Sequence, residues 1–332
     1  MTTTSQGQKR PEHTPLSSGK RSNADKWFRR TLALAGASLL FFLATMFIST
    51  AIDAWPVFQH SGWGFITSST WDVGTSRSEI TGEYGTLAFI VGTLLTSGIA
   101  LLIAVPLSIG TALYLSHVAS GRVRKPLSYA IELLAAVPSI VYGLWGLLFF
   151  VPVFLRPAMD FIAATVGQFI PFLGPPVVTY NYFAAGVVLS IMILPIITAV
   201  TREVMSRTPE SEIAAAYALG STRWEMLRFV VLHRSRPGII GAIMLGLGRA
   251  LGETIAVAML IGGSKLIGQT IFLGGESMAG IIAETFQEAA PENVKALIGV
   301  GVVLFIITII VNMIARGIVW ATGGRVMGDA SV

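Results

Sequence analysis

An arginine and a glutamate stand four positions apart inside a long apolar stretch of the sequence. Arg249 and Glu253 lie within residues 237–261, where every other side chain except that of Thr254 is apolar or absent. A bilayer crossing takes roughly 20 apolar residues, and an ionisable group at its centre costs at least about 2.5 kcal/mol on insertion scales. Charges at this depth usually mark a transport pathway or a buried partner. This pair is therefore the first candidate for the chemistry of the chain.

The two side chains suit an oxyanion. On one unbroken helix, residues four positions apart share a face, so we expect Arg249 and Glu253 to reach each other. A guanidinium stays charged at any relevant pH and offers two parallel hydrogen bonds to a phosphate group. Glu253 would hold Arg249 when no anion is present, or accept a proton from hydrogen phosphate. The alternative is a salt bridge that only fixes helix packing.

A second apolar stretch, residues 127–155, holds three further polar or special positions. Glu132 lies near one end of it and would line the exit of a path, pair with Arg249 or another arginine, or reach the membrane interface. Pro138 should kink the helix and free backbone carbonyls, some of which the Ser139 hydroxyl can satisfy. Ser139 and Thr254 are candidates for the wall of the path beside the charged residues. The alternative for Pro138 and Ser139 is a kink that only serves helix packing.

The composition predicts several membrane helices to position these groups. The 332 residues are 53% hydrophobic and 12% charged, against an average of about 25% charged. The chain has no cysteine, and its four histidines show no ligand spacing, so we expect no metal site. Residues 159–173 look interfacial or re-entrant. We expect an all-α integral membrane protein with about six spans: 31–52, 87–115, 127–155, 183–200, 237–261 and 296–314.

The positive charges predict an orientation. Eighteen lysines and arginines fall in the two tails and in the loops at 116–126 and 201–236, and four fall in the alternate loops. The positive-inside rule therefore places both termini in the cytoplasm. The first span lacks a small-residue cleavage site, so we expect a retained helix. The expected domains are a disordered basic tail at 1–28, a transmembrane domain at 29–323 and a cytoplasmic tail at 324–332.

The largest internal loop, at about 206–236, should fold as helix, turn and helix. Thr208 is placed as an N-cap, Gly220 as a left-handed terminator, and Thr222 with Glu225 as a capping box that starts a second short helix. The alanines between them would allow another protein to approach closely. The alternative is a loop that rests on the membrane surface.

This loop carries a resemblance to a known family. The segment Ala214–Gly220, followed by Val230-Val231-Leu232, resembles the coupling loop of ABC importer permeases, although Ala214 and His233 stand where the family has Glu and Pro. In that family the loop docks into the ATPase subunit. The resemblance implies that the 208–237 loop couples to an ATPase through the following residues: Ala214, Ala215, Ala216, Gly220, Trp224 and Leu232.

Two longer stretches narrow the resemblance. The sequence from Glu132 reads ELLAAVPSIVYGLWG, and that from Leu245 reads LGLGRALGET. They are similar to the third and fifth spans of phosphate ABC permeases, and the second is more like PstC-type subunits than PstA. The resemblance covers residues from about 31 to 323 and implies a type I ABC importer permease fold in the bacterial plasma membrane.

The resemblance also implies function and partners. The chain would form half of the phosphate path of an ATP-driven importer, and the path would include the candidates named above: Arg249, Glu253, Glu132, Ser139 and Thr254. The implied partners are a PstA-like second permease, a PstB-like ATPase dimer and a PstS-like extracytoplasmic binding protein. The chain contains no P-loop, so we expect no cofactor and no catalytic residue in it, and ATP with magnesium in the ATPase.

The expected outer loops are acidic. Nine carboxylates against four basic residues would repel free phosphate, which favours delivery by a docked binding protein. The loops at 53–84 and 262–295 would form the docking surface, with the following aromatic contacts: Trp55, Trp63, Trp71 and Phe286. The rival functions are a permease for another oxyanion such as sulfate or molybdate, a stand-alone secondary carrier, and an intramembrane enzyme. The last lacks a nucleophile–base or metal constellation.

Overall fold

The structure is a computed structural model that describes residues 23–73 and 81–321, with side chains for 26–73 and 81–317. The chain divides into two compact units, residues up to Ser49 and residues from Thr50 onward, and each is described by itself. Helix α1 (Asn23–Ser61) begins in the first unit and ends in the second. Its apolar side chains in the first unit, such as Phe41 and Phe42, are exposed. The predicted tail at 324–332 lies outside the described residues, as does the tail at 1–28 up to residue 22.

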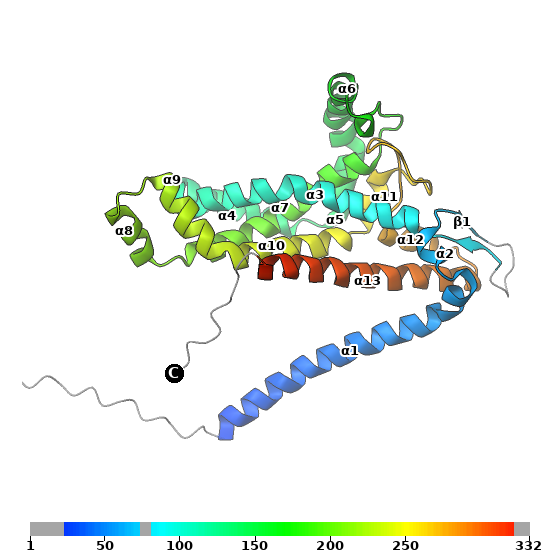
Figure 1. Cartoon of the computed structure of the whole chain (residues 1–332), viewed down its shortest axis with the longest axis horizontal. Coiled ribbons are helices and arrows are strands. Elements are labelled where there is room, and N and C mark those ends of the chain that lie inside the picture. Colours follow the sequence, from blue (N-terminus) through cyan, green and yellow to red (C-terminus); the bar gives the residue numbers. More distant parts are fainter. Residues whose placement is uncertain (1–22, 74–80, 322–332) are drawn as a thin grey trace, which may run out of the picture. The chain divides into compact units, whose positions relative to one another are not determined.

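Four long helices of the second unit lie side by side (Figure 1): α3 (Leu87–Leu113), α7 (Tyr182–Ser206), α10 (Leu232–Leu251) and α13 (Pro291–Ala321). Small residues bring α3 and α7 together, since Ala100 and Ala104 are fully buried and Gly186 rests on the Ile99 side chain. Glycine and alanine allow such close approach between membrane helices. Predicted spans 31–52, 183–200 and 296–314 each fall inside one helix, and 87–115 continues from α3 into η1 (Tyr114–Val118).

The third predicted span, 127–155, has the wrong start and the wrong end. Helix α4 (Gly121–Ala136) ends before Val137, and a new helix starts at Ser139 and runs to Thr165 through α5 (Ser139–Trp145), the π-helical η2 (Gly146–Leu155) and α6 (Arg156–Thr165). Proline lacks an N–H and forces the residue before it out of the helical region, which explains the stop at Val137. Part of the expected interfacial segment 159–173 therefore belongs to this long helix, and the rest ends in η3 (Pro171–Leu173).

The fifth predicted span, 237–261, is also not a single helix. It starts earlier, because α9 (Arg223–Glu225), η4 (Met226–Val231) and α10 form one continuous helix from Arg223 to Leu251. It then breaks at residues 252–254, and α11 (Ile255–Ile261) continues at an angle of 64°. The described residues thus contain five helices long and apolar enough to cross a membrane, or up to six with this bent pair.

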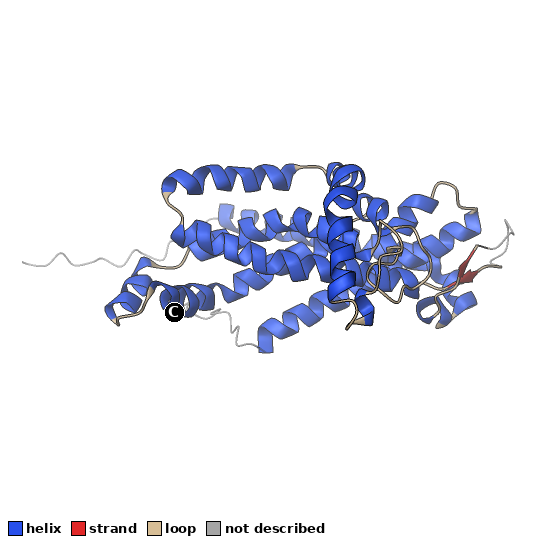
Figure 2. Ribbon diagram, turned by 90° about the horizontal axis from the view of Figure 1, so that it is seen from above, coloured by secondary structure: helices blue, strands red, loops and turns tan. Residues whose placement is uncertain are grey.

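Short elements gather at the two ends of the helices. One end, the α8 end, carries α8 (Glu210–Ala218) beside α9. The opposite end, the α12 end, carries α2 (Gly64–Thr67), α12 (Met278–Thr285) and the antiparallel pair β1 (Trp71–Asp72) and β2 (Glu83–Tyr84). Figure 2 shows this strand pair as the one small sheet in the described part of the chain.

Candidate functional site

The two broken helices touch each other. Gly143 of α5 lies against Ala256 of α11, where an added Cβ would come within 3.1 Å of the Ala256 Cα, and Gly146 lies against Leu260 in the same way. Residue numbers rise together along the contact, so α5 and α11 run in the same direction from their breaks. The break at 137–138 and the break at 252–254 therefore lie at the same level of the helix assembly.

The first break is completed by hydrogen bonds of its own. Pro138 has no N–H, so the carbonyl four residues earlier, that of Leu134, lacks its helical donor. The Tyr142 hydroxyl donates to this carbonyl at 2.9 Å, and the Val137 N–H donates to it at 3.3 Å. Sequence reasoning expected Ser139 to help here, whereas the structure places the Tyr142 hydroxyl on the freed carbonyl.

The second break separates the charged pair. Arg249 lies in the last turn of α10, Glu253 lies in the gap, and the Thr254 hydroxyl donates to the Gly252 carbonyl at 3.3 Å. The expectation that Arg249 and Glu253 meet on one helix face is wrong, because the helix ends between them. Among the described residues, neither forms an ion pair.

Arg249 carries an available donor at this level. Its side chain is half-buried, and its Nε is buried without a hydrogen-bond partner in the described structure. The guanidinium also lies near enough to the Tyr142 hydroxyl to interact with it electrostatically. A buried donor that lacks an acceptor is costly, so such a group calls for an explanation. An anionic ligand would supply the missing acceptor, because a guanidinium binds oxyanions through several N–H groups.

Glu132 lies apart from this group. Its carboxylate accepts a hydrogen bond from Arg202 of α7 at 3.1 Å, and its side chain is 53% exposed. Of the predicted alternatives, the structure therefore shows the pair with another arginine and not with Arg249. Arg249, Glu253, Thr254 and Ser139 all lie at or beside the two breaks, whereas Glu132 lies on α4.

The loop at the α8 end follows most of its predicted turns. Gly220 has a φ of +80°, and the Ser221 N–H donates a hydrogen bond to the Ala216 carbonyl at 3.2 Å. This left-handed turn ends α8 as expected. Thr222 and Glu225 form both bonds of the capping box. The N-cap is Pro209 and not Thr208, because Pro209 takes the extended conformation just before α8. The second helix is also not short, since it continues to Leu251.

The predicted coupling residues form a surface around a hollow. Ala216 is buried in an apolar cluster with Met226 and Val231, and it anchors α8 to the helix that follows. Leu232 is half-buried, and the other four are exposed: Ala214, Ala215, Gly220 and Trp224.

Beside these residues lies a cavity of about 870 Å³ between α8 and the start of α10. His233 lines it, as do Glu212 and Arg234, which form an ion pair of 2.9 Å. Sequence reasoning missed Leu219 and Phe229, which also line it and are 88% and 64% exposed. The signal available in the sequence was two large apolar residues in a charged loop.

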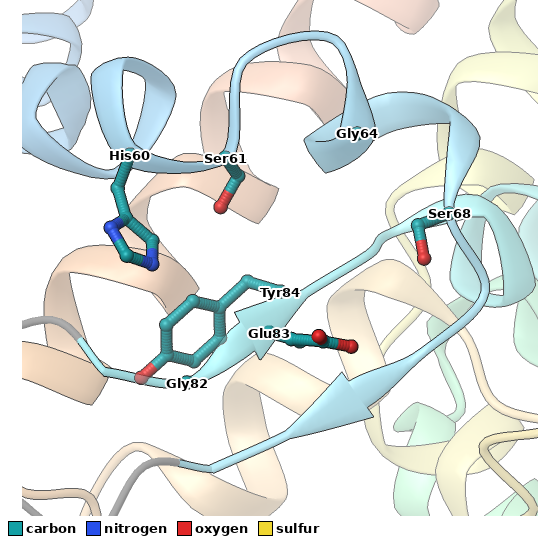
Figure 3. Close-up of a pocket in the computed structure, with 7 residues that line it drawn as sticks. All are labelled: His60, Ser61, Gly64, Ser68, Gly82, Glu83 and Tyr84. Atoms are coloured by element: carbon teal, nitrogen blue, oxygen red, sulfur yellow. The ribbon is translucent and has the colours of Figure 1, made fainter.

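The α12 end has a second hollow, of about 320 Å³. Figure 3 shows His60 and Ser61, from the end of α1, facing Glu83 and Tyr84 of β2 across it. The Tyr84 hydroxyl donates to Asn293 of α13 and ties the strand to the helices.

Three of the four predicted aromatic contacts at this end are exposed, namely Trp55, Trp63 and Phe286. Trp71 is different, because it packs edge-on against Tyr84 and Phe89. Its ring therefore supports the strand pair and is poorly placed to contact another protein.

Comparison with known proteins agrees with this architecture. A family described as "Binding-protein-dependent transport system inner membrane component" matches residues 104–322. A relative from Haemophilus influenzae, "Phosphate transport system permease protein PstC", is 41% identical over 293 residues, which cover 87% of this chain and 91% of that protein. A protein of the same name from Xylella fastidiosa is 40% identical over 314 residues, which cover 92% and 94%.

The fold also occurs in a solved importer. The crystal structure of a bacterial ABC transporter involved in the import of the acidic polysaccharide alginate matches with a TM-score of 0.55 at 17% identity and covers 89% of this chain and 96% of that one. A likeness at this identity concerns the fold alone. Together with the family match and the PstC relatives, the apolar helices show that the chain belongs to the binding-protein-dependent inner membrane permeases of ABC transporters, as a multi-pass member of the PstC group.

Proposed function

We propose that this chain forms half of the translocation path of an ATP-driven phosphate importer. The observation that carries the proposal is Arg249, whose buried Nε has no acceptor in the described structure and which lies where two broken helices meet. Broken membrane helices often mark the substrate site of a transporter, because irregular backbone is tolerated there only beside a cavity or within protein. The PstC relatives are named for phosphate transport, which fits the chemistry of a guanidinium.

The side chains at the breaks have different roles in binding the anion. Arg249 binds phosphate oxygens, and Ser139 and Thr254 offer hydroxyls from the two neighbouring helix starts. Glu253 accepts a hydrogen bond from the P–OH group of hydrogen phosphate, a donor that a fully deprotonated anion such as sulfate lacks. Arg249 is the only lysine or arginine inside the six predicted spans, so a PstA-like second permease has to supply further ligands.

The energy enters at the α8 end. The chain has no P-loop, so we assign ATP and magnesium to a PstB-like ATPase dimer and no catalysis to this subunit. Exposed Leu219, Phe229 and Trp224 offer that dimer an apolar contact around the cavity. The Glu212–Arg234 ion pair and buried Ala216 link α8 to the helix that carries Arg249 in its last turn, so movement of α8 reaches the breaks.

The α12 end then faces outward, and both termini lie in the cytoplasm, as the positive charges predict. A PstS-like binding protein docks there, on the surface that holds exposed Trp55, Trp63 and Phe286 and the pocket of Figure 3. We retain the domain limits 1–28, 29–323 and 324–332 for the tails and the permease.

Uptake by the reconstituted complex tests the proposal. Arg249→Gln and Arg249→Lys should abolish phosphate uptake while the complex still assembles, and the matched control Arg316→Gln, at an exposed arginine of α13, should keep it. Normal uptake by both Arg249 variants would refute the role of this residue. Stronger competition by sulfate or molybdate than by phosphate would favour another oxyanion, and uptake driven by a proton gradient without an ATPase would favour a secondary carrier.

A further inference from the structure

A carboxyl group is buried at the α12 end. Glu276, which precedes α12, is 2% exposed, and its Oε1 accepts a hydrogen bond from the Ser277 N–H at 2.8 Å. No lysine or arginine forms an ion pair with it in the described part of the chain. A buried carboxylate without a cationic partner is strongly disfavoured, so such groups hold a proton instead.

A second carboxyl group favours the protonated form of Glu276. Residues 276, 280 and 284 are spaced four apart, and the middle one is glycine. A Cβ on Gly280 would overlap the Glu276 Oε1, so the absence of a side chain leaves room for the carboxyl group along α12. Glu284, further along α12, adds to the preference of the Glu276 carboxyl for its protonated form, because two like charges close together repel each other.

The buried carboxyl lies where three helices are joined. The Thr93 hydroxyl of α3 accepts the Met278 N–H of α12 at 2.9 Å, and the backbone of Glu276 packs so closely on Gly92 that no Cβ would fit. One residue earlier, Gly275 packs on the ring of fully buried Tyr182 at the start of α7.

The segment before Glu276, residues 262–275, is attached at the same place. Its Ile271 and Leu273 carbonyls accept the Phe183 and Tyr182 N–H groups of α7 at 3.0 and 3.3 Å. A change at Glu276 therefore acts on the whole attachment of this segment and of α12.

We propose that Glu276 acts as a proton-operated clamp, which holds residues 262–277 and α12 against α3 and α7 when its carboxyl is protonated and releases them when the proton is lost. This inference goes beyond the proposed function and does not depend on the identity of the transported anion. In a permease it would make the opening of the α12 end depend on the pH of the compartment that it faces.

The surroundings set the pH range of the clamp. Burial raises the pKa of Glu276 to about 7, the Ser277 N–H opposes this, Glu284 adds to it and Lys265 lowers it. The other titratable neighbour is Tyr182 of α7. The contacts from α3 and α11 are Gly92, Thr93 and Ala258, none of which titrates.

The sign of the pH dependence follows from linkage. The clamped form binds the proton more tightly than a released form, whose carboxyl returns to the ordinary value of 4.5. The stabilisation is complete below that value and is lost as the pH rises to about 7. The equilibrium constant for release should therefore rise about tenfold per pH unit in this window and level off above it.

Hydrogen–deuterium exchange of the full-length chain in nanodiscs tests the clamp. After correction for the intrinsic pH dependence of exchange, the amides of residues 271–285 should exchange at least about tenfold faster at the upper end of the window than at the lower end. Glu276→Gln, which keeps the neutral form, should remove this dependence. Glu288→Gln, at an exposed glutamate just after α12, should keep it.

Two further measurements distinguish the loss of the clamp from the failure of a variant to fold. Glu284→Gln removes one cause of the raised pKa and should move the window to lower pH. Infrared difference spectra should show the carbonyl band of a protonated carboxyl that disappears as the pH rises through the window. A wild-type chain whose exchange does not change with pH, or a Glu276→Gln chain that retains the wild-type dependence, would overturn the proposal.

Discussion

The two helix breaks lie side by side, yet they differ in how they are completed. At Val137-Pro138 the carbonyl freed by the proline receives the Tyr142 hydroxyl, so the backbone is satisfied within the chain. At residues 252–254 the backbone bends by 64°, and Arg249 beside it keeps a buried Nε without a partner. The freed carbonyl at the first break has its donor within the chain, whereas Arg249 at the second break has a donor without an acceptor in the described structure.

This difference separates structural from functional irregularity. An unsatisfied buried polar group costs about 1–3 kcal/mol, and the cost is greater for a charged group. In the function that we propose, phosphate supplies the acceptor that the second break lacks. The comparison therefore predicts that changes at Arg249 affect transport more than stability, and that changes at Tyr142 do the reverse.

The largest expected effect is at Arg249. Because a hydrogen bond to a charged group contributes about 1.5–3 kcal/mol, Arg249→Gln should weaken phosphate binding about ten- to a hundredfold. The thermal stability of the purified chain should stay the same or rise, because the substitution removes a buried charge. Uptake kinetics and a melting curve on the same preparation measure both. A large loss of stability would instead make Arg249 a structural residue.

The next effect is at Tyr142. Tyr142→Phe leaves the Leu134 carbonyl with only the Val137 N–H as a donor and should cost about 0.5–1.5 kcal/mol of unfolding free energy. Urea or thermal unfolding in detergent measures it. Tyr180→Phe is a matched control, since the hydroxyl of Tyr180, which lies in the loop before α7, donates to the Leu147 carbonyl of η2 away from either break. Lost phosphate affinity in the Tyr142 variant at unchanged stability would contradict the distinction.

A double-mutant cycle sharpens the comparison further. In a Pro138→Ala chain, residue 138 regains an N–H that can reach the Leu134 carbonyl, so the tyrosine hydroxyl becomes partly redundant. We expect Tyr142→Phe to cost at least about 0.5 kcal/mol less in that background. Strict additivity of the two changes would show that the Tyr142 bond does not compensate for the proline.

The smallest effect is expected at Glu132. Its ion pair with Arg202 is exposed on the glutamate side, and such pairs contribute about 0–1 kcal/mol. Glu132→Gln should therefore change stability by less than about 1 kcal/mol and leave phosphate affinity intact, because Arg249 has no contact with it. Phosphate binding measured with the binding protein present decides the matter. A change in phosphate affinity as large as that of Arg249→Gln would show that Glu132 also lines the phosphate path.

Much of this molecule was predictable from its sequence. Hydropathy located four of the six predicted spans within helices, and the residues at 220, 222 and 225 predicted a glycine terminator and a capping box that the structure contains. The motifs around Arg249 and in the 214–232 loop indicated the family that the comparisons show. These signals act over one or two helical turns or over long similar segments, so they can be recognised without knowledge of the packing.

Only the tertiary structure decided which groups meet. The break at residues 252–254 parted Arg249 from Glu253, Arg202 paired with Glu132, and Trp71 turned into the packing around Phe89. The same packing buried Glu276, whose sequence context had indicated an ordinary loop carboxylate. The reason is physical: helix caps and hydropathy arise from near neighbours, whereas burial and the choice of a partner depend on helices that are distant in sequence and meet only in the folded chain.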